Sequence, residues 1–177
     1  RRLHEGFGWS NPVNLAYGYA RDVEAASGGY IRPRIVSWRT IDAFPSLEGD
    51  WQWTEDEFTT AARSGKWPKV ITDYRGEIET YGLAGKVDSG AADEFWFFGA
   101  PGFGFFEAAS FGPGAIPVNG GMYPDVPVSR PFAIMGFNYA RGAGEMLHDL
   151  AHRTDATMPH FYGGWNFLRN LSLEPFL

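Results

Sequence analysis

Two apolar runs limit the folds open to this chain more than any other feature of the sequence. Residues 93–98 (DEFWFF) and residues 131–137 (PFAIMGF) have the length of strands and are too short for typical helices. Continuous apolar strands are typical of parallel sheets, because helices cover both faces of such sheets. The two runs therefore predict neighbouring or near-neighbouring buried strands.

Helical patterns alternate with these strands. Ser10-Asn11-Pro12 has a capping side chain followed by proline, which predicts a helix start, and Gly28-Gly29 predicts its end. Residues 54–57 show capping-box spacing ahead of a short helix that ends near Gly65. Another helix is predicted over residues 69–81, because Ile71, Tyr74, Ile78 and Tyr81 share one face.

Two further segments complete the predicted fold. Residues 30–38 (YIRPRIVSW) predict a strand, with Pro33 indicating a sheet edge or a bulge. A further helix starts near Tyr139, directly after the second apolar run. We therefore expect residues 1–177 to form a single layered α/β domain, with a mostly parallel sheet and flanking helices.

Composition excludes several classes of protein. The net charge is −6 and no run of Lys or Arg occurs, so a nucleic-acid partner is not expected. No apolar stretch approaches the ~20 residues of a membrane span, so a membrane partner is not expected either. The chain has no cysteine, which excludes disulfides and thiolate chemistry. Because the chain opens on Arg1-Arg2 without an initiator Met, we expect it to be an excerpt of a longer product.

A long loop, residues 99–130, separates the two apolar runs and is dense in Gly and Pro, with only a short helix expected near Glu107. Long loops in compact domains are commonly lids or binding loops. Ligands bind at the carboxyl ends of parallel strands in open α/β sheets. We therefore expect this loop to cover those ends and to form one wall of the largest pocket.

A polar stripe follows the second strand on its helix. At ~100° per residue, Arg141, Glu145, His148 and His152 fall within about 60° of one another. Imidazoles at positions i and i+4 can bind one metal ion, and a nearby carboxylate can complete its coordination. A stripe of this kind is also what an ordinary amphipathic helix presents to water, and Arg141 with Glu145 can be a surface ion pair.

The run His148-Asp149-Leu150-Ala151-His152 resembles the zincin metallopeptidase motif His-Glu-x-x-His, with Asp in place of Glu. In zincins the two histidines bind zinc and the acid between them activates the metal-bound water. The resemblance implies that His148 and His152 bind zinc or another divalent metal, with Asp149 as the general base.

The third metal ligand is left open by the sequence. Glu145 is the first choice, since it precedes His148 by one helical turn. Asp155, His160 and Glu174 are the alternatives.

A second set of polar residues predicts chemistry without a metal. Glu107 lies after the glycine-rich stretch that follows the first strand, and it is either an acid near the ligand-binding edge or a capping or ion-paired residue. Glu107 and Glu145 could act as paired carboxylates on a sugar polymer, with tryptophans as stacking platforms. Asn138, Tyr139 and Arg141 follow the second strand and are candidates for substrate binding, while Asn138 could instead cap the next helix.

Residues 93–158 are also similar to segments of uncharacterised secreted bacterial and fungal proteins, which implies an extracellular location. The sequence thus favours a secreted metal-dependent hydrolase acting on peptide or cell-wall polymer. Its site would comprise His148, His152 and Glu145 at the metal, with Asp149 or Glu107 as the general base. The alternatives are a carbohydrate-active protein with paired carboxylates and a non-catalytic binding or structural module.

Overall fold

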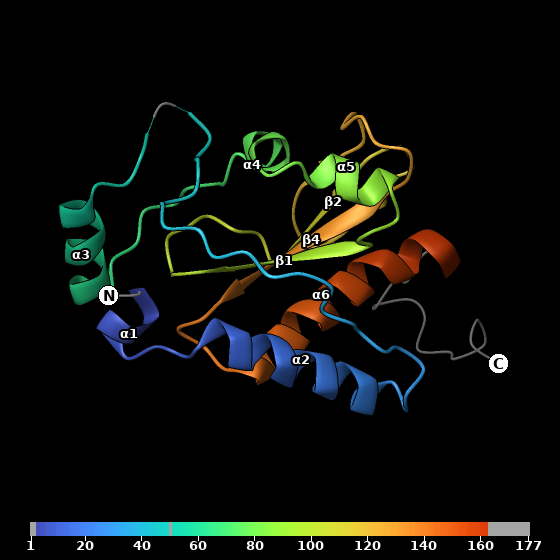
Figure 1. Cartoon of the computed structure of the whole chain (residues 1–177), viewed down its shortest axis with the longest axis horizontal. Helices are drawn as coiled ribbons and strands as arrows, with labels where there is room; N and C mark the ends of the chain where they lie inside the picture. The colour runs from blue at the N-terminus through green and yellow to red at the C-terminus, as the bar shows by residue number, and fades with distance from the viewer. Residues whose placement is uncertain (1–2, 50, 163–177) are drawn as a thin grey trace.

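The computed structural model describes residues 3–49 and 51–162, which fold around a four-stranded sheet (Figure 1). The strands are β1 (Glu94–Gly99), β2 (Ala108–Phe111), β3 (Met122–Tyr123) and β4 (Phe132–Asn138), in the spatial order β1-β4-β2-β3. β1 pairs in parallel with β4 and β2 pairs in parallel with β3, whereas β2 runs antiparallel to β4. The predicted α/β class is confirmed, with a sheet that is mostly parallel.

Six helices occupy the described part of the chain: α1 (Leu3–Phe7), α2 (Pro12–Ala26), α3 (Glu55–Ser64), α4 (Tyr74–Thr80), α5 (Leu83–Asp88) and α6 (Ala143–Tyr162). The local signals for α2 and α3 act as predicted. The Asn11 side chain accepts hydrogen bonds from two backbone N–H groups of α2, and Thr54 and Glu57 form the capping box of α3. None of these helices is long and apolar enough to cross a membrane.

Each face of the sheet carries its own hydrophobic core. On one face, Met135 and Phe137 of β4 pack with Tyr19 of α2 and Met146 of α6. On the other face, a second cluster joins β2 and β4 to α4 and α5. Figure 1 shows the same division, with α2 and α6 on one side of β1 and β4 and with α4 and α5 on the other. β4 is buried along almost its whole length because it has a strand on each side and a core on each face.

Three sequence predictions of secondary structure are wrong. Residues 30–38 form no strand, and the helix predicted over residues 69–81 begins only at Tyr74. The loop of residues 99–130 contains β2 and β3, and β2 stands where a short helix was expected near Glu107. Both of these strands are short and depend on distant partners for their hydrogen bonds, which a local sequence pattern does not reveal.

At Gly136, β4 packs closely against the segment that precedes β2. Its N–H donates to the Phe106 and Glu107 carbonyl oxygens, and a Cβ at this position would lie 2.5 Å from the Phe105 Cβ. We predict that Gly136→Ala lowers the free energy of unfolding by about 3 kcal/mol, because the backbone must shift to relieve the overlap. The matched control is Gly85→Ala in α5, where a Cβ meets nothing within 4 Å. Urea unfolding should show equal or higher stability for the control, and equal losses for both variants would contradict the prediction.

Candidate functional site

The carboxyl ends of β1 and β4 meet at one edge of the sheet, where Gly99 pairs with Asn138. A pocket of about 190 Å³ lies at this edge. Five of the residues singled out from the sequence line it together with the loop that follows β1: Glu107, Asn138, Arg141, Glu145 and Asp149. The structure thus brings together residues that are as much as 42 positions apart in the chain (149 − 107).

The turn between β4 and α6 positions the polar residues of this small pocket. The Asn138 side chain accepts a hydrogen bond from the Ala140 N–H at 2.9 Å. The backbone carbonyl oxygen of Asn138 accepts another from the Arg141 N–H at 3.0 Å. The helix begins at Ala143, so Glu145 and Asp149 stand one turn apart and both reach the pocket. Asn138 therefore stabilises the turn while lining the pocket.

Asp149 is the unusual group of the pocket. Asp149 is only 6% exposed, which is unusual for a residue with a carboxyl group. Burial raises the pKa of Asp149 to about 6, and the charge of Glu107 adds to this rise, while Arg141 and His152 lower it. A carboxyl group with such a pKa changes its protonation state near the pH at which proteins work, as a general acid or base must.

Glu107 and Glu145 make different contacts in the pocket. The Glu107 carboxylate accepts a hydrogen bond from the Asn119 side-chain amide. Glu145 forms an ion pair with Arg141 one turn earlier on the same helix, as the sequence allowed. Of the two, Glu107 is the one whose charge acts on Asp149. The carboxylates that influence each other in the structure are therefore Glu107 and Asp149.

His148 and His152 lie on the exposed side of α6. Their Nε2 atoms are 2.8 Å apart and the rings meet edge to face at an interplanar angle of 87°. The two rings are hydrogen-bonded to each other, and neither of them lines either pocket. In residues 3–49 and 51–162, no group of three or more His, Cys, Asp and Glu side chains is arranged to hold a metal ion. Glu174, one of the alternative third ligands, lies outside the described residues.

Tyr139 was a candidate for substrate binding, and the structure places it away from the small pocket. It is 7% exposed, and its ring packs against His4 at 6.2 Å and Trp9 at 5.9 Å between centroids. Its side chain instead lines a second, larger pocket. The strong apolar contacts of Tyr139 give it a packing role in this part of the fold.

The larger pocket was not found from the sequence. It has a volume of about 1980 Å³ and is lined by every residue from 31 to 45, a segment without helix or strand that we call the strap. The expectation that residues 99–130 wall the largest pocket is wrong in the main, because only Phe103 and Phe105 of that loop reach it. The loop lines the small pocket with residues 100–102, Gly104, Phe105 and Glu107 instead.

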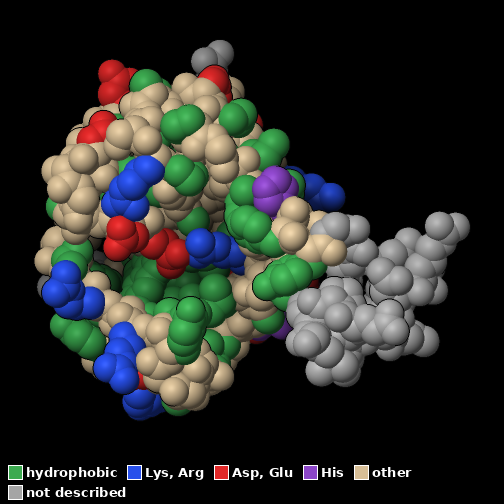
Figure 2. Space-filling view, turned by 90° about the vertical axis from the view of Figure 1, so that its right-hand side faces the viewer, with side chains coloured by type: hydrophobic (Ala, Val, Ile, Leu, Met, Phe, Trp, Pro, Cys, Tyr) green, Lys and Arg blue, Asp and Glu red, His purple; other side chains and the backbone are tan. Residues whose placement is uncertain are grey.

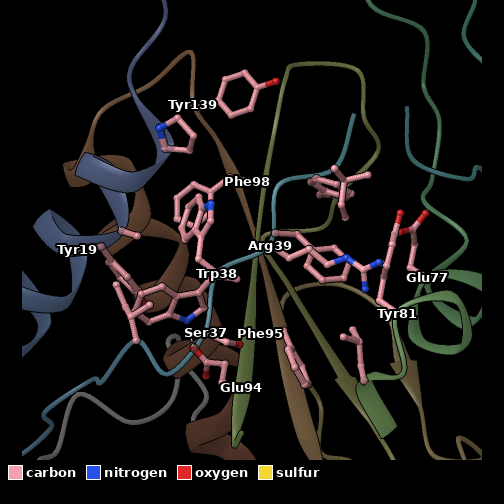
Figure 3. A pocket seen from close by; sticks show the side chains of 18 of the residues that line it. Tyr19, Ser37, Trp38, Arg39, Glu77, Tyr81, Glu94, Phe95, Phe98 and Tyr139 are labelled. Atoms are coloured by element: carbon pink, nitrogen blue, oxygen red, sulfur yellow. Dashed lines mark hydrogen bonds between the residues drawn. The ribbon is translucent and has the colours of Figure 1, made fainter. Parts of the chain in front are cut away.

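The strap crosses over β1, with Trp38 beside Phe98 and Arg39 beside Tyr81 (Figure 3). Trp38 lies 5.6 Å from the Phe98 ring, and the Arg39 guanidinium lies 4.7 Å from the Tyr81 ring. Viewed from the side where β1 begins, the molecule shows a hollow with hydrophobic side chains inside it and charged side chains around it (Figure 2). The one sequence signal for this feature was the β-forming composition of residues 30–38, which indicated the wrong structure.

Comparisons with known proteins do not assign the chain to a family. No family model, no curated protein and no solved structure matches it. The chemistry of the two pockets is therefore the basis for any statement about function.

The raised pKa of Asp149 has a consequence for stability. Because the folded-state pKa of about 6 lies above the usual value of an aspartate, ionisation of Asp149 opposes folding as pH rises through this range. Below the usual aspartate pKa the group is protonated in both states and contributes no penalty.

We predict that Asp149→Asn raises the free energy of unfolding at pH 7 by an amount on the order of 2 kcal/mol, and that the gain vanishes near pH 4. Denaturant unfolding at a series of pH values measures this. Glu145→Gln is the control, because Glu145 is not among the groups that raise the pKa of Asp149. If Asp149→Asn raised the free energy of unfolding equally at all pH values, the raised pKa of Asp149 would be contradicted.

Proposed function

We propose that the protein is a hydrolase that uses Asp149 and Glu107 as an acid–base pair on a peptide or cell-wall polysaccharide. The observation that carries this proposal is the buried Asp149 in an open pocket beside Glu107, with a pKa of about 6. Two carboxyl groups in one site, with the pKa of one raised, are the usual means of giving one proton and taking another. An extracellular location is part of this proposal, as the resemblance of residues 93–158 implied.

In this mechanism Asp149 is protonated and donates its proton to the leaving nitrogen or oxygen as the scissile bond breaks. Glu107 takes a proton from the attacking water, whose oxygen forms the new bond to carbon. Exchange with solvent then returns both groups to their starting states. Asn138 and Arg141 line the same pocket and would bind the polar groups of the substrate on either side of the bond.

We predict that Asp149→Asn and Glu107→Gln each reduce hydrolysis at least about 100-fold, because each removes one proton transfer. Dye-labelled casein and dye-labelled peptidoglycan are suitable substrates. Hydrolysis by the unaltered protein should decline above about pH 6, as Asp149 loses its proton. Glu145→Gln should retain most of the activity. Loss of activity in Glu145→Gln, with Asp149→Asn active, would instead favour Glu107 and Glu145 as the pair.

The second candidate function is the metal-dependent hydrolase. The supporting observation is that the Nε2 atoms of His148 and His152 lie 2.8 Å apart in a hydrogen bond, so a small separation of the two rings would let both nitrogens bind one ion. Zinc or another divalent metal would be held by these two imidazoles, with Glu145 released from Arg141 as the third ligand. The zincin resemblance assigns the base to Asp149, which would have to turn out of the small pocket to reach a water at these imidazoles.

This second function gives a separate prediction. Calorimetric titration with Zn²⁺ should show one site per chain, and His148→Ala or His152→Ala should abolish it without unfolding the protein. A chelator should then stop hydrolysis, whereas the metal-free mechanism predicts full activity in its presence. If neither substrate is cleaved with or without metal, the protein is a non-catalytic module and both hydrolase proposals are wrong.

A further inference from the structure

No strand of residues 3–49 or 51–162 lies beside the outer edge of β1. β1 pairs with β4 on one side only, and it ends the sheet in the described part of the chain. The Gly99 carbonyl oxygen accepts from the Tyr139 N–H and therefore faces β4. Because backbone groups of successive strand residues face opposite sides, those of Phe95 and Phe97 also face β4, and those of Glu94, Trp96 and Phe98 face the outer edge. Within the described residues, no backbone group bonds to this edge, so its donors and acceptors are open to a ligand.

The strap runs over this edge without pairing to it. Among the described residues, residues 31–45 make no backbone–backbone hydrogen bond at all. The large pocket lies between the strap and β1, so the outer edge of β1 borders it. An extended peptide is the ligand whose regularly spaced N–H and C=O groups can satisfy such an edge.

Side chains around the pocket indicate the composition of that peptide. The floor is apolar, and the strap exposes large hydrophobic side chains at Ile31, Val36, Trp38 and Ile41. The strap carries three arginines and one aspartate, a net charge of +2. The rest of the lining adds two basic and four acidic side chains: Lys86, Arg153, Glu55, Glu77, Asp93 and Glu94. Of these acids, Asp93 and Glu94 are ion-paired with arginines and Glu77 accepts a hydrogen bond from the Ser46 N–H. Neither Arg34 nor Arg39 forms an ion pair with a carboxylate in the described residues. Acidic side chains of a ligand would match Arg34 and Arg39 on the strap, and apolar ones would match the aromatic rings of residues 95–98.

We propose that the outer edge of β1 binds an extended peptide of alternating apolar and acidic residues, which lies beneath the strap and adds a strand to the sheet. β1 is six residues long, so a segment of about six residues fills the edge. This site is separate from the small pocket, since Phe105 is the single residue that lines both. The proposal does not rest on the hydrolase function and holds or fails independently of it.

Amide hydrogen exchange on the whole chain, followed by NMR, tests the proposal directly. The probe is a blocked hexapeptide of alternating glutamate and valine. In the free protein the amides of Trp96 and Phe98 should exchange faster than those of Phe95 and Phe97, because the latter bond to β4. Saturation with the peptide should slow Trp96 and Phe98 selectively. Unchanged exchange at these two amides would overturn the proposal, as would protection of strap amides in the free protein, which would make the strap itself the added strand.

Altered peptides separate strand addition from simple hydrophobic binding. Methylating the alternate backbone nitrogens that face β1 should weaken binding by about tenfold or more, because it removes several hydrogen bonds while keeping the side chains. Methylating the other set is the control and should change binding much less, because those nitrogens face away from β1. A lysine–valine hexapeptide should bind about tenfold more weakly than the glutamate–valine probe. Equal affinity of the methylated peptides would overturn strand addition.

Matched protein variants test the charge complementarity. The double variant Arg34→Glu, Arg39→Glu should reverse the preference between the glutamate and lysine peptides, since both side chains are exposed and lie on the strap. Arg21→Glu is the control, because Arg21 is an exposed arginine of α2 that does not line the pocket. An unchanged preference in the double variant would overturn the acidic composition proposed for the ligand.

Discussion

The parallel pairing of β1 with β4 over six residues is the interaction on which the rest of the structure depends. It directs Trp96 and Phe98 of β1 to the face covered by α2 and α6, and Phe95 and Phe97 to the face covered by α4 and α5. Because the strands are parallel, their carboxyl ends meet, and the polar residues that follow them converge on one small pocket. Because β1 ends the sheet among the residues that the structure describes, its outer edge has no strand partner there and lies beneath the strap.

The residues proposed for acid–base chemistry and those proposed for metal binding lie on different faces of α6. Its buried residues are Met146 and Asp149, while His148 and His152 lie on the exposed side. The carboxyl group of Asp149 is thus held in the small pocket, where its ionisation opposes folding. Stability given up at one polar group is typical of a functional site, and a simple core position would carry an apolar side chain here.

The strap gives the molecule a second feature that its core does not require. A segment of fifteen residues without helix or strand, crossing an open sheet edge, leaves many backbone groups to be satisfied by water or by a ligand. Ring contacts such as Trp38 with Phe98 hold it near β1 without closing the space between them. Natural sheets commonly protect a free edge, and here the protection is a loose cover with a pocket beneath it.

The sequence by itself determined the features that depend on near neighbours. The caps at Asn11 and Thr54 and the apolar runs of β1 and β4 were predicted, because a helix start or a buried strand leaves its pattern within a few residues. Only the tertiary structure decided whether residues 30–38 would find a strand partner, since strand pairing depends on distant segments. It also decided the burial of Asp149, which lies about 40° from Glu145 and about 60° from Met146 around the helix. Asp149 thus lies at the border between the polar and apolar faces, where helical periodicity does not predict whether a side chain is buried. Its burial is determined by the position of Glu107 and by the sheet beneath α6.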